Sequence, residues 1–270
     1  MGIFKMKMNW KVKIWRYLII IVVGTYLLLP LYAMLDFSTK PFSVAPDQSR
    51  TLNAFKVIPS QPDLMLAVTR SLVSAAIVMF LILTLIVPTI VWVHLKLPKL
   101  KRTIELICLI PLAIPAIVIV VGIAPLYRWI SINITESPIS LSLVYSMLIL
   151  PYTYRALSAA LDAADIHTLA EAARTLGAST SRMMVGIIMP TLRTGIANGA
   201  FIAIALVLGE YTISNLLNFK TFQVVIGQLG RTNGVVAVAV SISSILFVLL
   251  LILLIPQKKN RKEILDVDVA

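Results

Sequence analysis

Few side chains in this sequence could carry out catalysis. The 270 residues contain two histidines, His94 and His167, and one cysteine, Cys108. There is no HExxH pair, no plausible Ser-His-Asp arrangement, no cluster of metal-ligand residues and no GxxxxGK[ST] loop for the phosphates of a nucleotide. Cys108 lies in an apolar run, where it behaves as a small hydrophobic residue. The sequence therefore predicts a protein that is not an enzyme, holds no cofactor or metal, and depends on another chain for any use of ATP.

The segment 164–193 has the features of a docking site. Thr168 and Glu171 have the spacing of a capping box, in which a hydroxyl and a carboxylate bind the free amides of a helix's first turn. A helix is therefore predicted to begin at Leu169. Gly177 stands where a residue with left-handed backbone would end this helix, after about eight residues or roughly 12 Å.

A second short helix is predicted after Gly177. Ser179 or Thr180 can cap its start, and Pro190 is expected to end it. A tight turn would be enough to connect two membrane spans, so two short helices indicate a surface that binds the groove of a partner. The alternative is an amphipathic connecting loop without a partner.

Glu210 is predicted to lie well inside a membrane span. The span in question covers about residues 195–217 and is the fifth of those described below. At about 1.5 Å per residue, Glu210 lies roughly 20 Å along this span from its inner end. An ionisable group at that depth is costly and by default functional. Two interpretations are open, namely a residue of a pathway through the membrane or of its gate, and a hydrogen bond between helices. Tyr211, Ser214 and Asn215 continue a polar face at near-helical spacing, which favours a path accessible to water.

Membrane helices must position these residues, because the composition is that of a chain embedded in lipid. The sequence is 59% hydrophobic and 13% charged, with a mean hydropathy of +0.94. A bilayer core about 30 Å thick needs roughly 20 apolar residues per helix. Runs of this length predict an all-α membrane protein with six transmembrane helices, at about residues 17–35, 71–93, 104–123, 139–157, 195–217 and 234–255. Pro111, Pro115 and Pro151 predict kinks in the third and fourth spans.

The basic residues indicate the orientation. The net charge of +12 would favour nucleic-acid binding in a soluble protein, but here the charges flank the apolar runs. With both termini in the cytoplasm, 17 of the 24 basic residues lie on the cytoplasmic side. The predicted organisation is a cytoplasmic N-terminus (1–16), a transmembrane anchor (17–35), an external loop (36–63), a membrane domain (64–255) and a cytoplasmic tail (256–270), without a nucleic-acid partner.

Several of these motifs resemble the permeases of type I ABC importers. Glu171-Ala172-Ala173, then Gly177, Ile188 and Pro190, resemble the EAA loop of that family. The stretches 110–115 and 150–155 are also similar, and the resemblance covers about residues 64–255. Gly209-Glu210-Tyr211 resembles an element of the polyamine, phosphonate, iron and thiamine branches. Two departures are mild: Met189-Pro190 and Thr194-Gly195 stand where the family commonly has Leu-Pro and Pro-Gly.

The resemblance implies half of a permease dimer in a bacterial inner membrane, paired with an identical or a different second permease. Two cytoplasmic ABC ATPase subunits would bind the loop, and an extracytoplasmic binding protein would deliver the solute. The implied ATPase-coupling residues are Glu171, Ala172, Ala173, Leu176, Gly177, Ile188 and Pro190. The pathway residues would be Glu210, Tyr211, Ser214 and Asn215. Expected solutes are polyamines such as spermidine and putrescine, then aminoalkylphosphonates, then ferric iron.

Two other classes of function remain open from the sequence. An autonomous secondary transporter or channel would show paired broken helices in an inverted repeat and several intramembrane carboxylates. No such repeat is evident in the sequence. A membrane scaffold protein would use the segment 164–193 as a generic docking site. Association with an ATPase distinguishes the permease from both.

Overall fold

The computed structural model describes residues 10–41 and 50–254, and within these ranges it contains helices and connections but no strand. The predicted all-α fold is confirmed. Residues 1–9, most of the predicted cytoplasmic N-terminus, lie outside the described residues, as do part of the predicted external loop (42–49) and the predicted tail (256–270).

The chain divides into two units, one formed by residues 1–61 and 226–270 and the other by residues 62–225. In the first unit, α1 (Trp10–Ser38) packs against α14 (Gly234–Leu254), and Phe37 lies beside Gly234. The predicted external loop contains two short helices, α2 (Asn53–Val57) and η1 (Ile58–Ser60). Helix α13 (Phe222–Thr232) leads from one unit to the other.

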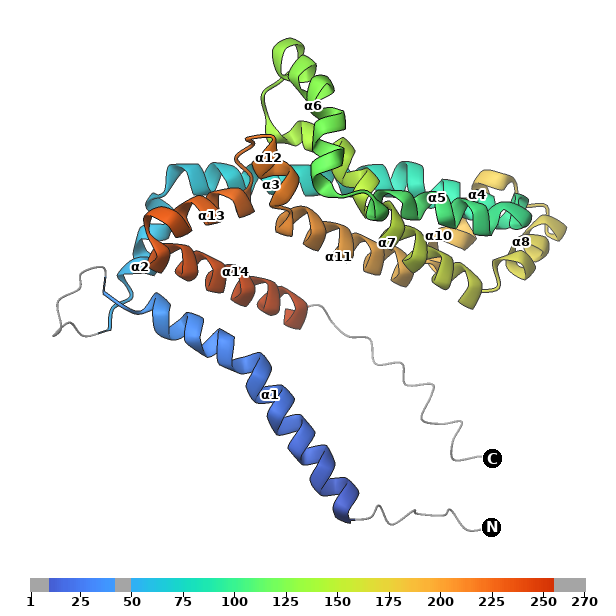
Figure 1. Ribbon diagram of the computed structural model, residues 1–270. Helices are drawn as coiled ribbons and strands as arrows, with labels where there is room; N and C mark the ends of the chain where they lie inside the picture. The colour runs from blue at the N-terminus through green and yellow to red at the C-terminus, as the bar shows by residue number, and fades with distance from the viewer. Residues whose placement is uncertain (1–9, 42–49, 255–270) are drawn as a thin grey trace. The chain divides into compact units, whose positions relative to one another are not determined.

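The second unit is a bundle built around α7 (Ser142–Ala163), which contacts α3, α4, α5 and α11 (Figure 1). The helices before α7 are α3 (Pro62–Leu81), η2 (Ile82–Ile86), α4 (Val87–Lys96), η3 (Pro98–Leu100), α5 (Lys101–Ala113), α6 (Ala116–Asn133) and η4 (Pro138–Leu141). Those after the loop that follows α7 are α11 (Arg193–Gly209) and α12 (Thr212–Leu216). One continuous apolar core extends from α3 to α12.

Helices occupy all six predicted spans, but they differ in apolarity. Four described segments are long and apolar enough to cross a bilayer, namely Ile14–Ser38, Asp63–Lys96, Ala116–Asn133 and Arg193–Leu216, and Gly234–Leu250 is a shorter apolar helix. Helix α7, at the fourth predicted span, is more polar. Its Ser142, Thr153 and Ser158 are buried among neighbouring helices, so they do not face lipid. A central helix can therefore carry polar residues that a lipid-facing helix could not.

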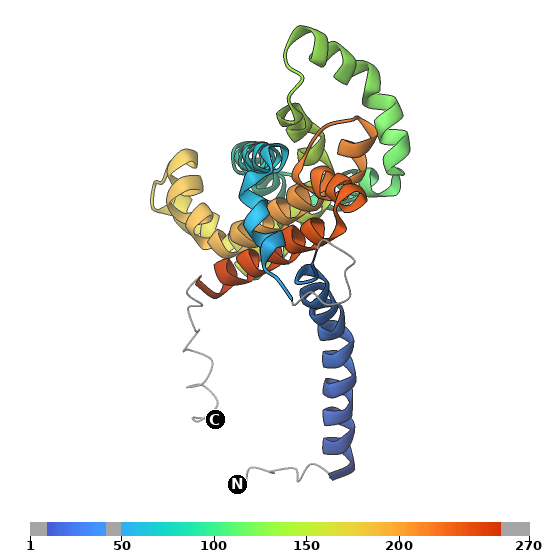
Figure 2. The same ribbon diagram turned by 90° about the vertical axis from the view of Figure 1, so that its left-hand side faces the viewer.

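The third predicted span is broken rather than kinked. Ile114 and Pro115 have extended backbone between α5 and α6, because the ring of a proline pushes the preceding residue out of the helical region. Helix α6 then continues through Pro125 to Asn133, beyond the predicted end of the third span at residue 123. From the end of α5, α6 runs outward, and the chain turns back beyond it toward α7 (Figure 2).

Small residues bring α11 close to α7. Gly195, Gly199 and Ala203 are buried at four-residue spacing along one face of α11. A Cβ built on Gly195 would lie 2.5 Å from the Cβ of Ala160, and one on Gly199 would lie 3.5 Å from Thr153 Cγ2. Close backbone approach of this kind is how helices associate in lipid, where the hydrophobic effect contributes little.

Candidate functional site

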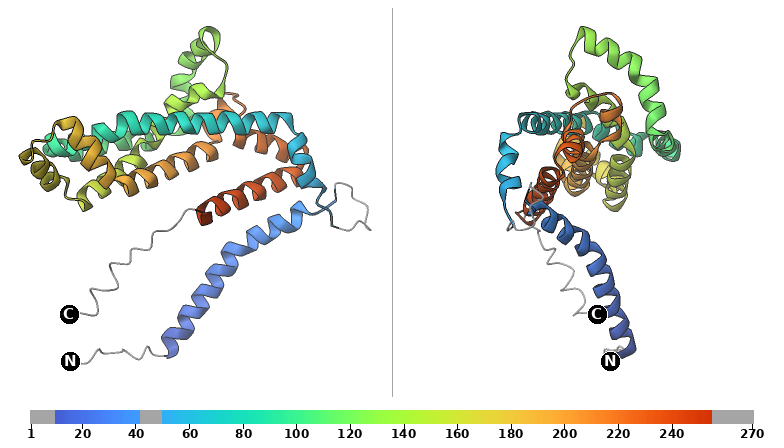
Figure 3. Two further views of the ribbon diagram at one scale, coloured as in Figure 1. Left: turned by 180° about the vertical axis from the view of Figure 1, so that it is seen from behind. Right: turned by 60° about the vertical axis from the view of Figure 1, so that its left-hand side comes forward.

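The segment after α7 folds into a two-helix elbow, defined here as residues 166–191. It consists of α8 (Ile166–Thr175), α9 (Thr180–Met183), η5 (Met184–Ile188) and α10 (Met189–Thr191). The elbow lies at one end of the second unit, beside the end of α4 and the start of α5 (Figure 3). The predicted pair of short helices between two spans is therefore present.

The elbow begins earlier than the capping box predicted. Helix α8 starts at Ile166 rather than Leu169, so Thr168 lies inside the helix. Its hydroxyl donates to the Asp165 carboxylate (2.7 Å) instead of capping the first turn. Asp165 has left-handed backbone (φ +42°), which makes a sharp corner between α7 and α8, and Ile166 is buried immediately after it. Burial of Ile166 thus fixes the start of the helix at the corner.

The end of α8 agrees with the prediction. Gly177 has left-handed backbone (φ +76°), and its N–H donates to the Arg174 carbonyl (2.9 Å). The N–H of Ala178 donates to the Ala173 carbonyl (3.0 Å), which completes the hydrogen-bond pattern of a Schellman C-terminus. Ser179 then caps α9, because its hydroxyl accepts from the N–H of Arg182 (3.3 Å).

Pro190 does not end the second helix, contrary to prediction. Helical turns continue to Thr191, and the break comes at Leu192. The preceding turn, η5, is a π-helix, and the same arrangement precedes Pro88, where η2 is also a π-helix. A proline ring clashes with the carbonyl four residues earlier in a regular helix. Widening that turn makes room for the ring, so the helix continues past the proline.

The predicted coupling residues divide between two faces of the elbow. Ala173 and Ile188 are buried in the second unit, together with Ile166 and Ala170 of α8. The remaining predicted residues, Glu171, Ala172, Leu176, Gly177 and Pro190, are exposed. Leu176 is 87% exposed at the C-terminus of α8. One face therefore holds α8 on the bundle, and the other presents a small apolar and charged surface.

Glu210 lies at a break in the fifth predicted span. Helix α11 ends at Gly209 and α12 begins at Thr212, so the span is not the continuous helix that was predicted. The Glu210 carboxylate accepts from the N–H groups of Ile213 (2.6 Å) and Ser214 (3.1 Å) and from the Ser214 hydroxyl (2.7 Å). The Tyr145 hydroxyl of α7 donates to the same carboxylate (3.1 Å). The carboxylate thus satisfies amides that the break leaves free, which favours the hydrogen-bonding interpretation of this residue.

The other predicted pathway residues lie at different depths around this break. Ser214 is fully buried, Tyr211 is half-buried and Asn215 is exposed. Glu210 and Tyr145 also line a hollow of about 140 Å³ between α5, α7 and α11. Its remaining lining is Leu112, Leu148, Ile149, Tyr152, Leu206 and Val207. The hollow is therefore mostly apolar, with one carboxylate and two tyrosines on its wall.

Comparison with known families identifies the kind of protein. Residues 64–261 match the family described as binding-protein-dependent transport system inner membrane component. The chain belongs to this family. It is a component of an ABC importer permease, and the predicted resemblance is confirmed at this level. No match was found among curated proteins.

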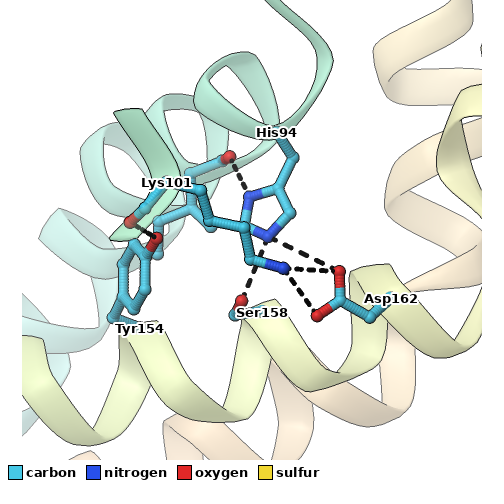
Figure 4. Close-up of polar contacts among 6 residues, drawn as sticks. His94, Lys101, Tyr154, Ser158 and Asp162 are labelled. Carbon is cyan, nitrogen blue, oxygen red and sulfur yellow. Dashed lines mark hydrogen bonds and ion pairs between the residues drawn. The ribbon is translucent and has the colours of Figure 1, made fainter. Parts of the chain in front are cut away.

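The permease also contains a polar stripe that the sequence analysis missed. Tyr154, Ser158 and Asp162 follow one another at four-residue spacing on one face of α7, and each contacts α4 or α5 (Figure 4). The Tyr154 hydroxyl donates to the Lys101 carbonyl (3.1 Å), and Lys101 Nζ lies 2.7 Å from both carboxylate oxygens of Asp162. The four-residue spacing was visible in the sequence, but the partners lie more than 50 residues away.

His94 of the permease belongs to this stripe and is 4% exposed. Its Nδ1 lies 2.9 Å from the Ile90 carbonyl, which can only accept, so Nδ1 carries a hydrogen. In the neutral ring, Nε2 then accepts from the Ser158 hydroxyl (3.0 Å). The buried ring is fully used in joining α4 to α7, which is a structural role.

Proposed function

We propose that this permease component forms half of a translocation pathway and couples ATP hydrolysis by a separate subunit to solute uptake. In this proposal the exposed face of α8 is the surface that binds the ATPase. The observation that carries it is Leu176, which is 87% exposed at the C-terminal end of a helix that is buried along one side.

The packing of α8 suits it to transmit force. Ile166, Ala170 and Ala173 are buried along one side of the helix, so α8 cannot move independently of the residues that it packs against. A short helix held in this way presents its outer residues in a fixed geometry, as binding to a groove requires. Movement of a bound ATPase would therefore reach the bundle through these packed residues.

The chemistry of the exposed face also suits a protein partner. Leu176 supplies an apolar side chain for a pocket, and apolar groups buried at the centre of an interface contribute most of its affinity. Ala172 allows close approach, and Glu171 supplies a charge that can pair with a basic residue. The left-handed Gly177 ends the helix directly after Leu176, so the leucine stands at its tip.

The proposed assembly has one of these chains, a second permease that is identical or different, two cytoplasmic ATPase subunits and an extracytoplasmic binding protein. Both termini and the elbow face the cytoplasm, and residues 64–255 form the permease domain after the anchor at 17–35. Glu210, Tyr211 and Asn215 belong to the pathway wall, and Ser214, which is buried, supports the wall from behind. The solute is a polyamine, an aminoalkylphosphonate or ferric iron.

Capture of the ATPase tests this proposal. The chain is co-expressed with each candidate ABC ATPase of its source and purified from membranes. Leu176→Asp places a charge on the exposed face of α8, and Glu171→Lys reverses a charge on the same face. Each variant is expected to capture about tenfold less ATPase, because loss of a central contact has an effect of this size. The matched control is Glu136→Lys, which reverses an exposed charge in the segment between α6 and η4.

Two results would contradict the proposal. Capture of the ATPase by the Leu176→Asp variant at the wild-type level would show that α8 is not the docking surface. Failure of the wild-type chain to capture any candidate ATPase would favour an autonomous secondary transporter instead.

A further inference from the structure

We propose that Asp162, through its ion pair with Lys101, is a positioning residue that sets the orientation of α8. The pair is called here the Lys101–Asp162 latch. This inference rests on the proposed function of α8, because it concerns how the docking surface is held. Lys101 Nζ lies 2.7 Å from each oxygen of the Asp162 carboxylate, which joins the start of α5 to the last turn of α7.

Both charges stand at the unfavourable end of their own helix. Lys101 is the first residue of α5, and Asp162 is the penultimate residue of α7. A helix has partial positive charge at its N-terminus and partial negative charge at its C-terminus, so each side chain is repelled by the helix that carries it. The two residues satisfy each other instead. Residues that are unfavourable in their own helices but favourable as a pair indicate a role in the assembled structure.

The latch lies directly before the joint that carries α8. Asp162 precedes Asp165 by three residues, and Asp165 turns the chain with left-handed backbone, which among L-residues mainly asparagine and aspartate adopt. A hollow of about 170 Å³ lies beside the joint, lined by residues of α4, η3, α5, α7 and α8. Its polar lining consists of His94, Lys101, Asp162, Asp165 and His167. The joint therefore has space into which it can move when the latch opens.

The polar stripe divides into a fixed part and a part that can open. The His94–Ser158 hydrogen bond is buried and holds α4 on α7. One turn further along, the side chains of Asp162 and Lys101 are 58% and 32% exposed. An ion pair exposed to this extent contributes little to stability, so it can break without unfolding the bundle. The last turn of α7 is thus the first part that can move when force reaches α8.

Distances between spin labels on α5 and α8 test whether the latch positions α8. Spin labels are attached through Thr103→Cys in α5 and Thr175→Cys in α8, both exposed, after the native cysteine is removed by Cys108→Ala. Lys101→Asp and Asp162→Lys each bring like charges together and are expected to broaden the distribution of distances between the labels. The double variant Lys101→Asp with Asp162→Lys restores an ion pair, now with each charge at its favourable helix end, and is expected to narrow the distribution again.

The second readout is solute transported per ATP hydrolysed by the reconstituted importer. Each single variant is expected to lower this ratio by about fivefold, and the double variant to recover it to within about twofold of wild type. The control Lys99→Asp makes the same charge change at an exposed neighbouring site and should affect neither readout.

Different results would contradict the latch and the docking role of α8. Unchanged label distances in the single variants, no recovery in the double variant, or equal broadening in Lys99→Asp would overturn the latch. Altered distances with an unchanged transport ratio would overturn its positioning role. Retained ATPase capture by Leu176→Asp would instead contradict the docking role of α8, while the label distances would still report on the latch.

Discussion

At the scale of single residues, Glu210 shows how a costly charge can be stabilised inside a membrane protein. Its carboxylate accepts hydrogen bonds from two backbone N–H groups and one serine hydroxyl of α12, and one from Tyr145 of α7. The break between α11 and α12 leaves these amides without helical partners, and the carboxylate supplies them. The same group joins two helices and lines a hollow, so it has a structural role.

This assignment predicts a graded loss of stability at Glu210. Replacing Glu210 by Ala removes all four acceptor contacts and should lower the free energy of unfolding by about 2 kcal/mol, while Glu210→Gln keeps one acceptor oxygen and should cost about 1 kcal/mol. Tyr145→Phe removes a single hydroxyl and serves as a milder comparison. Thermal unfolding in detergent measures the relative stabilities of these variants. An Ala variant as stable as wild type but unable to transport would assign Glu210 to the pathway alone.

At the scale of helices, the contact of α11 with α7 depends on the absence of side chains. Gly195 and Gly199 lie on the face of α11 that meets α7, and a methyl group on Gly195 would meet Ala160. Gly122 of α6 is a matched position, because nothing lies within 4 Å of a Cβ built there. Comparing an alanine substitution at Gly195 with one at Gly122 therefore distinguishes the effect of packing from the effect of helix propensity.

The expected result is opposite in sign at the two positions. Gly195→Ala forces α7 and α11 apart and should cost about 1–3 kcal/mol, as overpacking does. Gly122→Ala should be neutral or stabilise the protein by up to about 1 kcal/mol, because alanine favours helix over glycine. Unfolding midpoints of the two variants, measured side by side, check this. Equal effects would mean that the close approach of α7 and α11 is not required.

The helices themselves could be predicted from sequence, because an apolar run long enough to span a bilayer forms a helix in almost every case. The left-handed end at Gly177 and the cap at Ser179 were also predictable, since each depends on the chemistry of one residue. The predicted start at Leu169 and end at Pro190 were wrong for a shared reason. Burial of Ile166 and widening of the turn before Pro190 are effects of packing, which local patterns do not contain.

The contacts between distant residues were not predictable. His94 meets Ser158, and Lys101 meets Asp162, across more than 60 positions of the chain. The prediction of one helix over residues 195–217 was also wrong, since neither Glu210 nor Tyr211 is a residue type that breaks helices. The resemblance predicted the coupling residues of the elbow as a group. It could not indicate that Leu176 is exposed whereas Ile188 is buried.

At the scale of the whole molecule, α7 connects the two candidate sites of the second unit. Tyr145 of α7 meets Glu210 at the break between α11 and α12, and Asp162 of the same helix meets Lys101 next to the elbow. These two residues are 17 positions apart, or roughly 25 Å along a helix. We therefore expect movement at α8 to reach the hollow beside Glu210 through this central helix, which touches both sites.

The docking of α8 on an ATPase is the central claim, and cross-linking in membranes tests it most directly. A photoreactive amino acid replaces Leu176 in one variant and Glu136 in another, in cells that also produce the candidate ATPases. The Leu176 variant is expected to become covalently linked to an ATPase subunit after illumination, whereas the Glu136 variant is not. Illumination of the Leu176 variant that yields no ATPase adduct, while the wild-type importer transports solute in the same cells, would contradict it.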